Sequence, residues 1–312
     1  MKNQYSKMMG ALTAASVVMT GYAVAGVTEP APMVAPAPAR DFFEGEIHVG
    51  YNNMYEHRFV DLGDDMVEAG VDVAFDLGGG WSINAGAWYA STNDDKYDYD
   101  EGPSYVFGDD VLTPYQETWR DSFNELDLYA GVGAEYGMFN FEVGYIYYFF
   151  PDNRDVNTSE IYASVGVDLP WEMGLTATGY YDIEEYSGLY VDLKVTKSFE
   201  LTECLGLDLA AGIGYADGHG LQQDGPFNWR STRDGYQGWY ISAALPWEII
   251  ENVTLTPYIK YTDADSDLVT DNAWREFGYI DGAGGYHYTG YQNGTSQGKD
   301  YIVAGATLSV AF

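Results

Sequence analysis

Residues 301–312, which end the chain, read YIVAGATLSVAF and decide the fold class. Counting back from Phe312, an apolar residue recurs at every second position: Val310, Leu308, Ala306, Ala304 and Ile302. The positions between them hold smaller or more polar residues such as Gly305 and Ser309. A repeat of two residues places the two sets of side chains on opposite faces of a β-strand. The segment is therefore predicted to be a strand with one apolar face.

This last strand resembles the closing strand of bacterial outer-membrane β-barrels, whose end is also what the assembly machinery reads. The resemblance implies an assembly signal at Phe312, Val310 and Leu308, with the barrel-assembly machinery as a partner. The alternative is an edge strand of a soluble β-sandwich. An unpaired apolar edge at a chain end promotes aggregation in water, and pairing with the first strand of a closed barrel removes that edge.

The start of the chain has the features of a secreted protein. Lysines precede a mostly apolar run at residues 8–24, and Ala23-Val24-Ala25 fits the A-x-A cleavage pattern. We therefore expect residues 1–25 to be a cleaved signal peptide. Residues 26–43 are rich in Pro and Ala, which is typical of an extended tether, here periplasmic. We predict that residues 44–312 form one barrel domain.

Composition narrows the class of protein further. The chain has 48 acidic and 14 basic residues, so it would repel the phosphates of nucleic acid, and we expect no nucleic-acid partner. Its 29 Tyr and 37 Gly favour strands, aromatic girdles and tight turns. After residue 25 no apolar run approaches the ~20 residues that a spanning helix needs, so any crossing of a membrane is by strands. The single cysteine, Cys204, excludes an internal disulfide.

Alternation recurs in twelve segments along the chain. They are residues 44–54, 66–77, 81–91, 123–136, 139–150, 157–169, 174–183, 189–199, 205–215, 236–245, 253–262 and 301–312. Links after even-numbered segments are mostly short, whereas links after odd-numbered segments include 92–121, 216–235 and 263–299. Outer-membrane barrels have short periplasmic turns and long external loops. The sequence predicts an all-β, transmembrane, antiparallel up-and-down barrel of twelve strands with both termini in the periplasm.

Charge separates the two faces of these segments. The face predicted to contact lipid has no charged residue in its central part, where an Arg or Lys would cost ~2–4 kcal/mol. The other face is predicted to line a pore. Its charged residues are Glu46, Glu68, Asp72, Asp76, Glu125, Asp127, Glu135, Glu142, Glu160, Asp168, Asp182, Asp192 and Asp208, with Lys194 and Lys260.

One hairpin carries a family resemblance. Gly144-Tyr145-Ile146-Tyr147-Tyr148 with Pro151, followed by Ser159-Glu160-Ile161-Tyr162, resembles a hairpin of the Gcw_chp family of conserved hypothetical outer-membrane proteins. The likeness extends over about residues 44–215. It implies an outer-membrane barrel and implies no activity, because the family has no assigned chemistry.

Catalysis is not indicated by the histidines. His48 is predicted to point inward near the start of the first strand, and His57, His219 and His287 fall in loops. None of them accompanies a serine nucleophile in a recognisable motif, which a hydrolytic site requires. We expect no enzyme and no cofactor.

The spacing of four aspartates raises the hypothesis of a calcium site. Asp263, Asp265 and Asp267, with Asp271 further on, have the D-x-D-x-D spacing of calcium loops. However, Leu268 and Trp274 stand where an EF-hand needs Gly and Glu. The other interpretation is diffuse binding of divalent cations by the acidic external loops, beside lipopolysaccharide.

Two functions of different classes remain open. The first is a porin-like outer-membrane channel for small hydrophilic solutes, expected to select cations because its lumen is acidic. The second is a structural or adhesin-like barrel with a plugged lumen and functional external loops. Twelve strands lie between eight-stranded barrels filled by side chains and open sixteen-stranded porins. Membrane lipid and lipopolysaccharide are the expected partners; the solute and the oligomeric state are left open.

Overall fold

The computed structural model describes residues 43–93, 105–107, 110–112, 124–151, 157–184, 187–218, 234–265, 274–280, 286–293 and 300–312. The predicted signal peptide and nearly all of the predicted tether lie outside these ranges. Every regular element within them is a β-strand. None of the described segments forms a helix long and apolar enough to cross a membrane.

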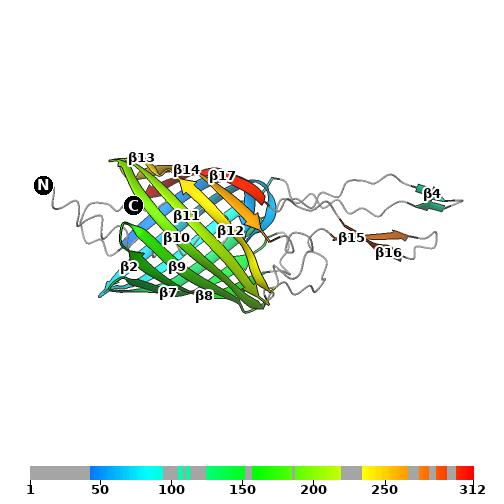
Figure 1. The fold of residues 1–312 in the computed structure, drawn as a ribbon, viewed down its shortest axis with the longest axis horizontal. Coiled ribbons are helices and arrows are strands. Elements are labelled where there is room, and N and C mark those ends of the chain that lie inside the picture. The colour runs from blue at the N-terminus through cyan, green and yellow to red at the C-terminus, as the bar shows by residue number, and fades with distance from the viewer. Residues whose placement is uncertain are drawn as a thin grey trace.

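Twelve antiparallel strands form a closed barrel (Figure 1). In ring order they are β1 (Phe43–His57), β2 (Val60–Gly78), β3 (Trp81–Ser91), β6 (Asn124–Tyr136), β7 (Phe139–Phe149), β8 (Thr158–Leu169), β9 (Met173–Asp182), β10 (Gly188–Thr202), β11 (Leu205–Asp217), β12 (Gly235–Ala244), β14 (Val253–Ala264) and β17 (Asp300–Ala311). Each strand pairs with the next, and β17 pairs with β1 to close the ring. The predicted all-β, antiparallel barrel of twelve strands is confirmed.

Five short strands lie in links that the sequence indicated to be loops or turns. β13 (Trp247–Ile250) pairs with β11 and β14 at the end of the barrel. β4 (Tyr105–Phe107) pairs with β5 (Asp110–Leu112), and β15 (Trp274–Ile280) pairs with β16 (Tyr286–Asn293). These two hairpins lie beyond the end of the barrel opposite the C-terminus (Figure 1). Two of the three long links, 92–121 and 263–299, thus lie at one end of the barrel, as predicted, but each contains a strand hairpin of its own.

Alternation in the sequence becomes alternation of burial in the barrel. In β6, Leu128 and Val132 are exposed on the outer surface, while Glu125 and Asp127 are buried on the inner face. Along the middle of the strand the buried set therefore includes the charged residues and the exposed set is apolar, while Glu135 near its end is exposed. This is the reverse of a soluble domain and the arrangement expected of a barrel surrounded by lipid.

The first two strands depart most from the prediction. The predicted strands 44–54 and 66–77 left residues 55–65 as a link. In the structure β1 continues to His57 and β2 begins at Val60, so the link is a strand hairpin with a two-residue turn. Its register shifts between Tyr55 and Glu56, which marks a β-bulge. A bulge bends the strand that carries it.

Closure of the ring brings the two ends of the barrel domain together. Ile47 pairs with Val310 and Val49 with Leu308, so apolar residues match along the outer face of the seam. The Gly45 amide donates to the Phe312 carbonyl at 3.0 Å, and the Phe312 amide donates to the Gly45 carbonyl at 2.8 Å. The Phe312 ring lies over Gly45, with its centroid 6.0 Å from that of Phe43.

The contacts of Phe312 where β1 meets β17 predict the effect of replacing this residue. Phe312→Ser should reduce the yield of assembled barrel and its melting temperature, because it removes an aromatic pair worth ~0.5–1.5 kcal/mol and the expected assembly signal. The measurement is the heat-modifiable band shift of membrane fractions. Phe199→Ser, which removes an outward ring from β10 away from the seam, is the matched control. Unchanged yield and melting of Phe312→Ser would contradict the prediction.

Candidate functional site in the barrel lumen

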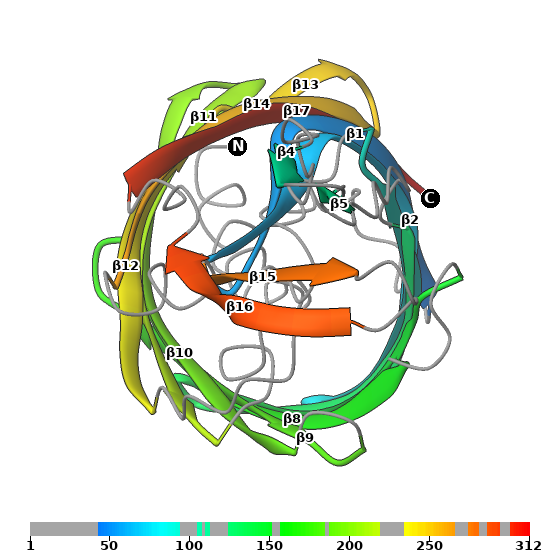
Figure 2. The same ribbon diagram turned by 90° about the vertical axis from the view of Figure 1, so that its right-hand side faces the viewer.

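The hairpin between β1 and β2 crosses the inside of the barrel. Figure 2 looks into the barrel from the end where β15 and β16 lie, and shows the hairpin leaving the wall and running across the interior. We call its tip, residues 55–60, the inner hairpin. In ring order β9 and β10 are the strands farthest from β1 and β2. The contacts of the inner hairpin with this far wall define the candidate site.

The turn of the inner hairpin has an unusual backbone. Its two central residues, Arg58 and Phe59, have φ of 51° and 70°. A type I′ hairpin turn needs positive φ at both central positions, which is why Asn-Gly and Asp-Gly dominate there. For residues with a Cβ this conformation costs ~1–2 kcal/mol each. Such a cost persists only where the surrounding contacts impose the conformation, so the side chains of the turn are expected to be well anchored.

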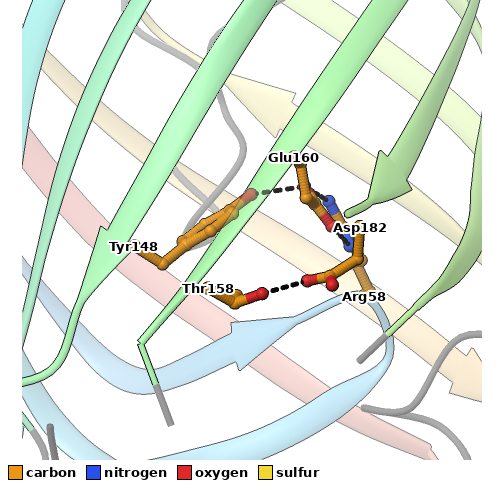
Figure 3. A network of polar contacts seen from close by, with 5 residues as sticks. All are labelled: Arg58, Tyr148, Thr158, Glu160 and Asp182. Carbon is orange, nitrogen blue, oxygen red and sulfur yellow. Dashed lines mark hydrogen bonds and ion pairs between the residues drawn. The ribbon is translucent and has the colours of Figure 1, made fainter. Parts of the chain in front are cut away.

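Arg58 makes the principal anchor. Its Nη1 and Nη2 atoms each donate to one carboxylate oxygen of Glu160 on β8, both at 2.6 Å (Figure 3). The Tyr148 hydroxyl on β7 donates to Glu160 Oε2 at 2.7 Å. The side chains of Arg58 and Glu160 are 5% and 2% exposed. A fork-to-fork pair of this kind is among the stronger ionic contacts that proteins make, and it fixes the orientation of both groups.

Two tyrosine rings complete the surroundings of Arg58. Its Cζ atom lies 4.7 Å from the ring centroid of Tyr180 on β9 and 4.7 Å from that of Tyr190 on β10. These separations are within the range of cation–π attraction. We call Tyr148, Glu160, Tyr180 and Tyr190, which all belong to the barrel wall, the guanidinium seat.

A second carboxylate lies beside the seat. Asp182 is the cross-strand neighbour of Glu160 in the β8–β9 register. It accepts from the Thr158 hydroxyl at 2.5 Å (Figure 3) and from the Ser187 amide at 3.0 Å. Like charges directly opposite each other in a sheet destabilise it. The positive charge that Arg58 brings to Glu160 offsets this repulsion.

The other residues of the tip also touch distant strands. The Phe59 ring lies against Gly214 on β11 and Gly238 on β12, where a side chain at either glycine would collide with it. Its centroid is 6.2 Å from that of Tyr240. The His57 ring lies 6.4 Å from the ring of Tyr148 in an edge-on arrangement. Residues 57–59 thus contact six consecutive strands, from β7 to β12.

The base of the inner hairpin is tied to both flanking walls. Tyr55 is fully buried, and its hydroxyl donates to Glu125 on β6 at 2.5 Å. Glu56 accepts from Lys260 Nζ at 3.0 Å and from the Thr262 hydroxyl at 2.9 Å, both on β14. The inner hairpin is therefore held from three directions.

Aromatic donors face many of the remaining lumen carboxylates. The Tyr162 hydroxyl donates to Glu142 at 2.5 Å, the Trp88 indole N–H to Glu68 at 3.0 Å, and the Tyr129 hydroxyl to Asp72. The Tyr162 ring fits over Gly144 on the neighbouring strand, where any side chain would collide with it. At this position the glycine accommodates a ring.

The predicted pore-lining residues divide into three groups. Buried inside the barrel are Glu46, Glu68, Asp72, Glu125, Asp127, Glu142, Glu160, Asp182 and Lys194. Half-buried are Asp168, Asp192, Asp208 and Lys260. Asp76 and Glu135 are exposed near strand ends. Sequence reasoning missed Tyr55, Glu56, Arg58 and Phe59, and Arg-Phe carries no turn signal that would have revealed the hairpin.

The other candidate residues stay apart from the guanidinium seat. His48 is buried with its Nδ1 atom 3.6 Å from Asp72, and Cys204 is exposed in the β10–β11 turn. His219, Asp267 and Asp271 lie outside the described residues, so the calcium hypothesis stays a prediction. Within the described part of the chain, no three His, Cys, Asp or Glu side chains are grouped as metal ligands.

Comparisons with known proteins return barrels of low similarity. Neither a family model nor a curated protein sequence matches the chain, so the likeness to the Gcw_chp family remains a resemblance. Among solved structures, the KdgM porin shares 7% identity at a TM-score of 0.43, covering 86% of this chain and 99% of its own. The NanC porin shares 10% at 0.42, covering 86% and 98%. An outer membrane channel from Pseudomonas putida F1 shares 6% at 0.44, covering 89% and 100%. Similarity at this level transfers no function.

The tyrosine–carboxylate pairs predict a selective loss of stability. Tyr162→Phe should lower the free energy of unfolding by ~1.5–3 kcal/mol, since a hydrogen bond to a charged group is lost while the ring stays over Gly144. The measurement is urea unfolding in detergent micelles. Tyr181→Phe, at an exposed outward position on β9, is the matched control and should be close to neutral. Equal effects of the two substitutions would contradict this role for the lumen pairs.

Proposed function

We propose that the chain is a narrow outer-membrane channel that favours cations. The inner hairpin constricts this channel. The observation that carries the proposal is the charge inside the barrel. Nine Asp and Glu residues are buried among the described residues. The cations that accompany them on the inner face are Arg58, Lys194 and Lys260. With the half-buried Asp168, Asp192 and Asp208 of the same face, twelve carboxylates accompany these three cations.

The outer surface supports a place in a membrane. Exposed large apolar residues surround the barrel, and examples from separate strands are Val49, Val71, Leu128, Val143, Ile161, Leu193, Ile213, Ile241, Ile259 and Leu308. A soluble protein rarely exposes so extensive an apolar surface. We place this belt in the bacterial outer membrane, in contact with lipid and lipopolysaccharide, with both termini periplasmic and assembly by the barrel-assembly machinery.

The donors in the lumen explain why an acidic interior can hold its charge. A hydroxyl or indole N–H stabilises a carboxylate through a hydrogen bond without contributing a positive charge, as Tyr129 does for Asp72. A lumen with low-dielectric walls focuses the remaining negative field. Cations are then concentrated in the pore and anions are excluded.

A second candidate function is a plugged structural or adhesin-like barrel. The specific observation in its favour is the inner hairpin, which crosses the lumen and makes buried contacts on the far wall. The β4–β5 and β15–β16 hairpins beyond the barrel end would then carry the contacts with ligands or neighbouring cells. Conductance separates the two candidates, because a fully plugged barrel passes no ions.

The channel proposal predicts cation selectivity in a planar bilayer. Under a potassium chloride gradient at low salt, the reversal potential should show preference for potassium, weakening near 1 M as the Debye length falls to ~3 Å. Replacing Asp72, Asp127 and Asp208 together by Asn should lower the preference. The control replaces the exposed Glu172, Glu200 and Glu203 by Gln and should leave it nearly unchanged.

Two results would count against this proposal. Selectivity for chloride, or none at low salt, would contradict the acidic lumen as the source of selectivity. Absence of conductance in every condition would favour the plugged barrel.

A further inference from the structure

We propose that the guanidinium seat is a binding site for a solute that carries a guanidinium group, and that Arg58 is its internal competitor. The inference rests on the proposed channel function and names a class of solute for it. Its first observation is that Arg58 and the four residues it contacts belong to different parts of the fold. Arg58 comes from the inner hairpin, whereas Tyr148, Glu160, Tyr180 and Tyr190 all belong to the barrel wall.

The wall holds the seat in place without using the inner hairpin. Tyr148 pairs with Thr158 in the β7–β8 register, Glu160 with Asp182 in the β8–β9 register, and Tyr180 with Tyr190 in the β9–β10 register. The Tyr148 hydroxyl orients the Glu160 carboxylate, and the Tyr180 and Tyr190 ring centroids lie 6.3 Å apart. Since these positions are fixed by the barrel, the seat is expected to persist when Arg58 leaves it.

The chemistry of the seat selects a planar cation. The two Glu160 oxygens accept the two Nη donors of Arg58 at the same distance, 2.6 Å, which matches a guanidinium fork. The tyrosine rings offer their faces to the same group. A compact ammonium ion presents no such fork and is more strongly hydrated. The seat should therefore prefer a guanidinium group to an alkylammonium of the same charge.

A solute could replace Arg58 in the guanidinium seat because of the backbone conformation of the hairpin. Arg58 reaches the seat only through a turn in which two residues with side chains have positive φ. A solute guanidinium could make the same contacts with Glu160, Tyr180 and Tyr190 without that backbone constraint. Arg58 is tethered, however, so it competes at a high effective concentration and weakens the binding of a free solute. Removing its charge should therefore raise the affinity of the wall for the solute.

The test is isothermal titration of the refolded full-length protein in detergent micelles with ethylguanidinium chloride. We expect Arg58→Ala to bind this probe at least about ten-fold more tightly than the wild type. The Arg58→Ala protein should bind ethylammonium chloride much more weakly. Adding Glu160→Gln to Arg58→Ala should abolish binding of ethylguanidinium. The heat-modifiable band shift verifies that each variant is folded.

Several outcomes would overturn the proposal. They are equal affinity in wild type and folded Arg58→Ala, no binding to folded Arg58→Ala, binding that survives Glu160→Gln, and equal affinity for ethylammonium. Should Arg58→Ala not fold, Arg58→Gln keeps a polar side chain without the charge. Failure of both to fold would show that the seat depends on Arg58 and would also refute the proposal. Titration needs no conductance, so this result and that of the bilayer experiment are independent.

Discussion

Every feature of the barrel depends on one constraint, the closure of its hydrogen-bonded ring. A bilayer core offers backbone groups no hydrogen-bond partner, so a sheet that crosses it must leave no open edge. The pairing of β1 with β17 meets this requirement and brings Gly45 against Phe312. Once the ring is closed, alternate residues of each strand must face either the outside of the barrel or its lumen. The apolar outer surface and the acidic interior both follow from this division.

The interior shows how a protein can bury many carboxylates within one barrel. The wall supplies hydroxyl and indole donors, such as Tyr162 for Glu142 and Trp88 for Glu68. At the β8–β9 pair, where Glu160 lies in register with Asp182, the structure brings in a cation, Arg58, on a hairpin that crosses the lumen. The path of the first hairpin and the charge balance of the far wall are therefore linked, because the hairpin must cross the lumen to bring Arg58 to Glu160.

Much of the fold could be predicted from the sequence, and the candidate site could not. Alternation located all twelve barrel strands because apolar residues recur at every second position in segments such as β6. The inner hairpin was not predicted because Arg58-Phe59 lacks the Gly or Asn that marks a two-residue turn. The conformation of this turn is imposed instead by contacts with β8 to β12. The alternation along β7 places Gly144 on the lumen face, but it does not reveal that the Tyr162 ring occupies the space above this glycine. These are tertiary effects, invisible to local patterns.

The central claim is that the first hairpin lies inside the barrel and reaches the opposite wall, and photo-crosslinking tests it most directly. p-Benzoylphenylalanine in place of Phe59, in protein assembled in membranes, should crosslink to β11 or β12, at peptides that contain Gly214 or Gly238. The same group in place of the outward-facing Tyr181 should crosslink to lipid. Crosslinks from position 59 to lipid alone, or to the β4–β5 or β15–β16 hairpins outside the barrel, would contradict the account.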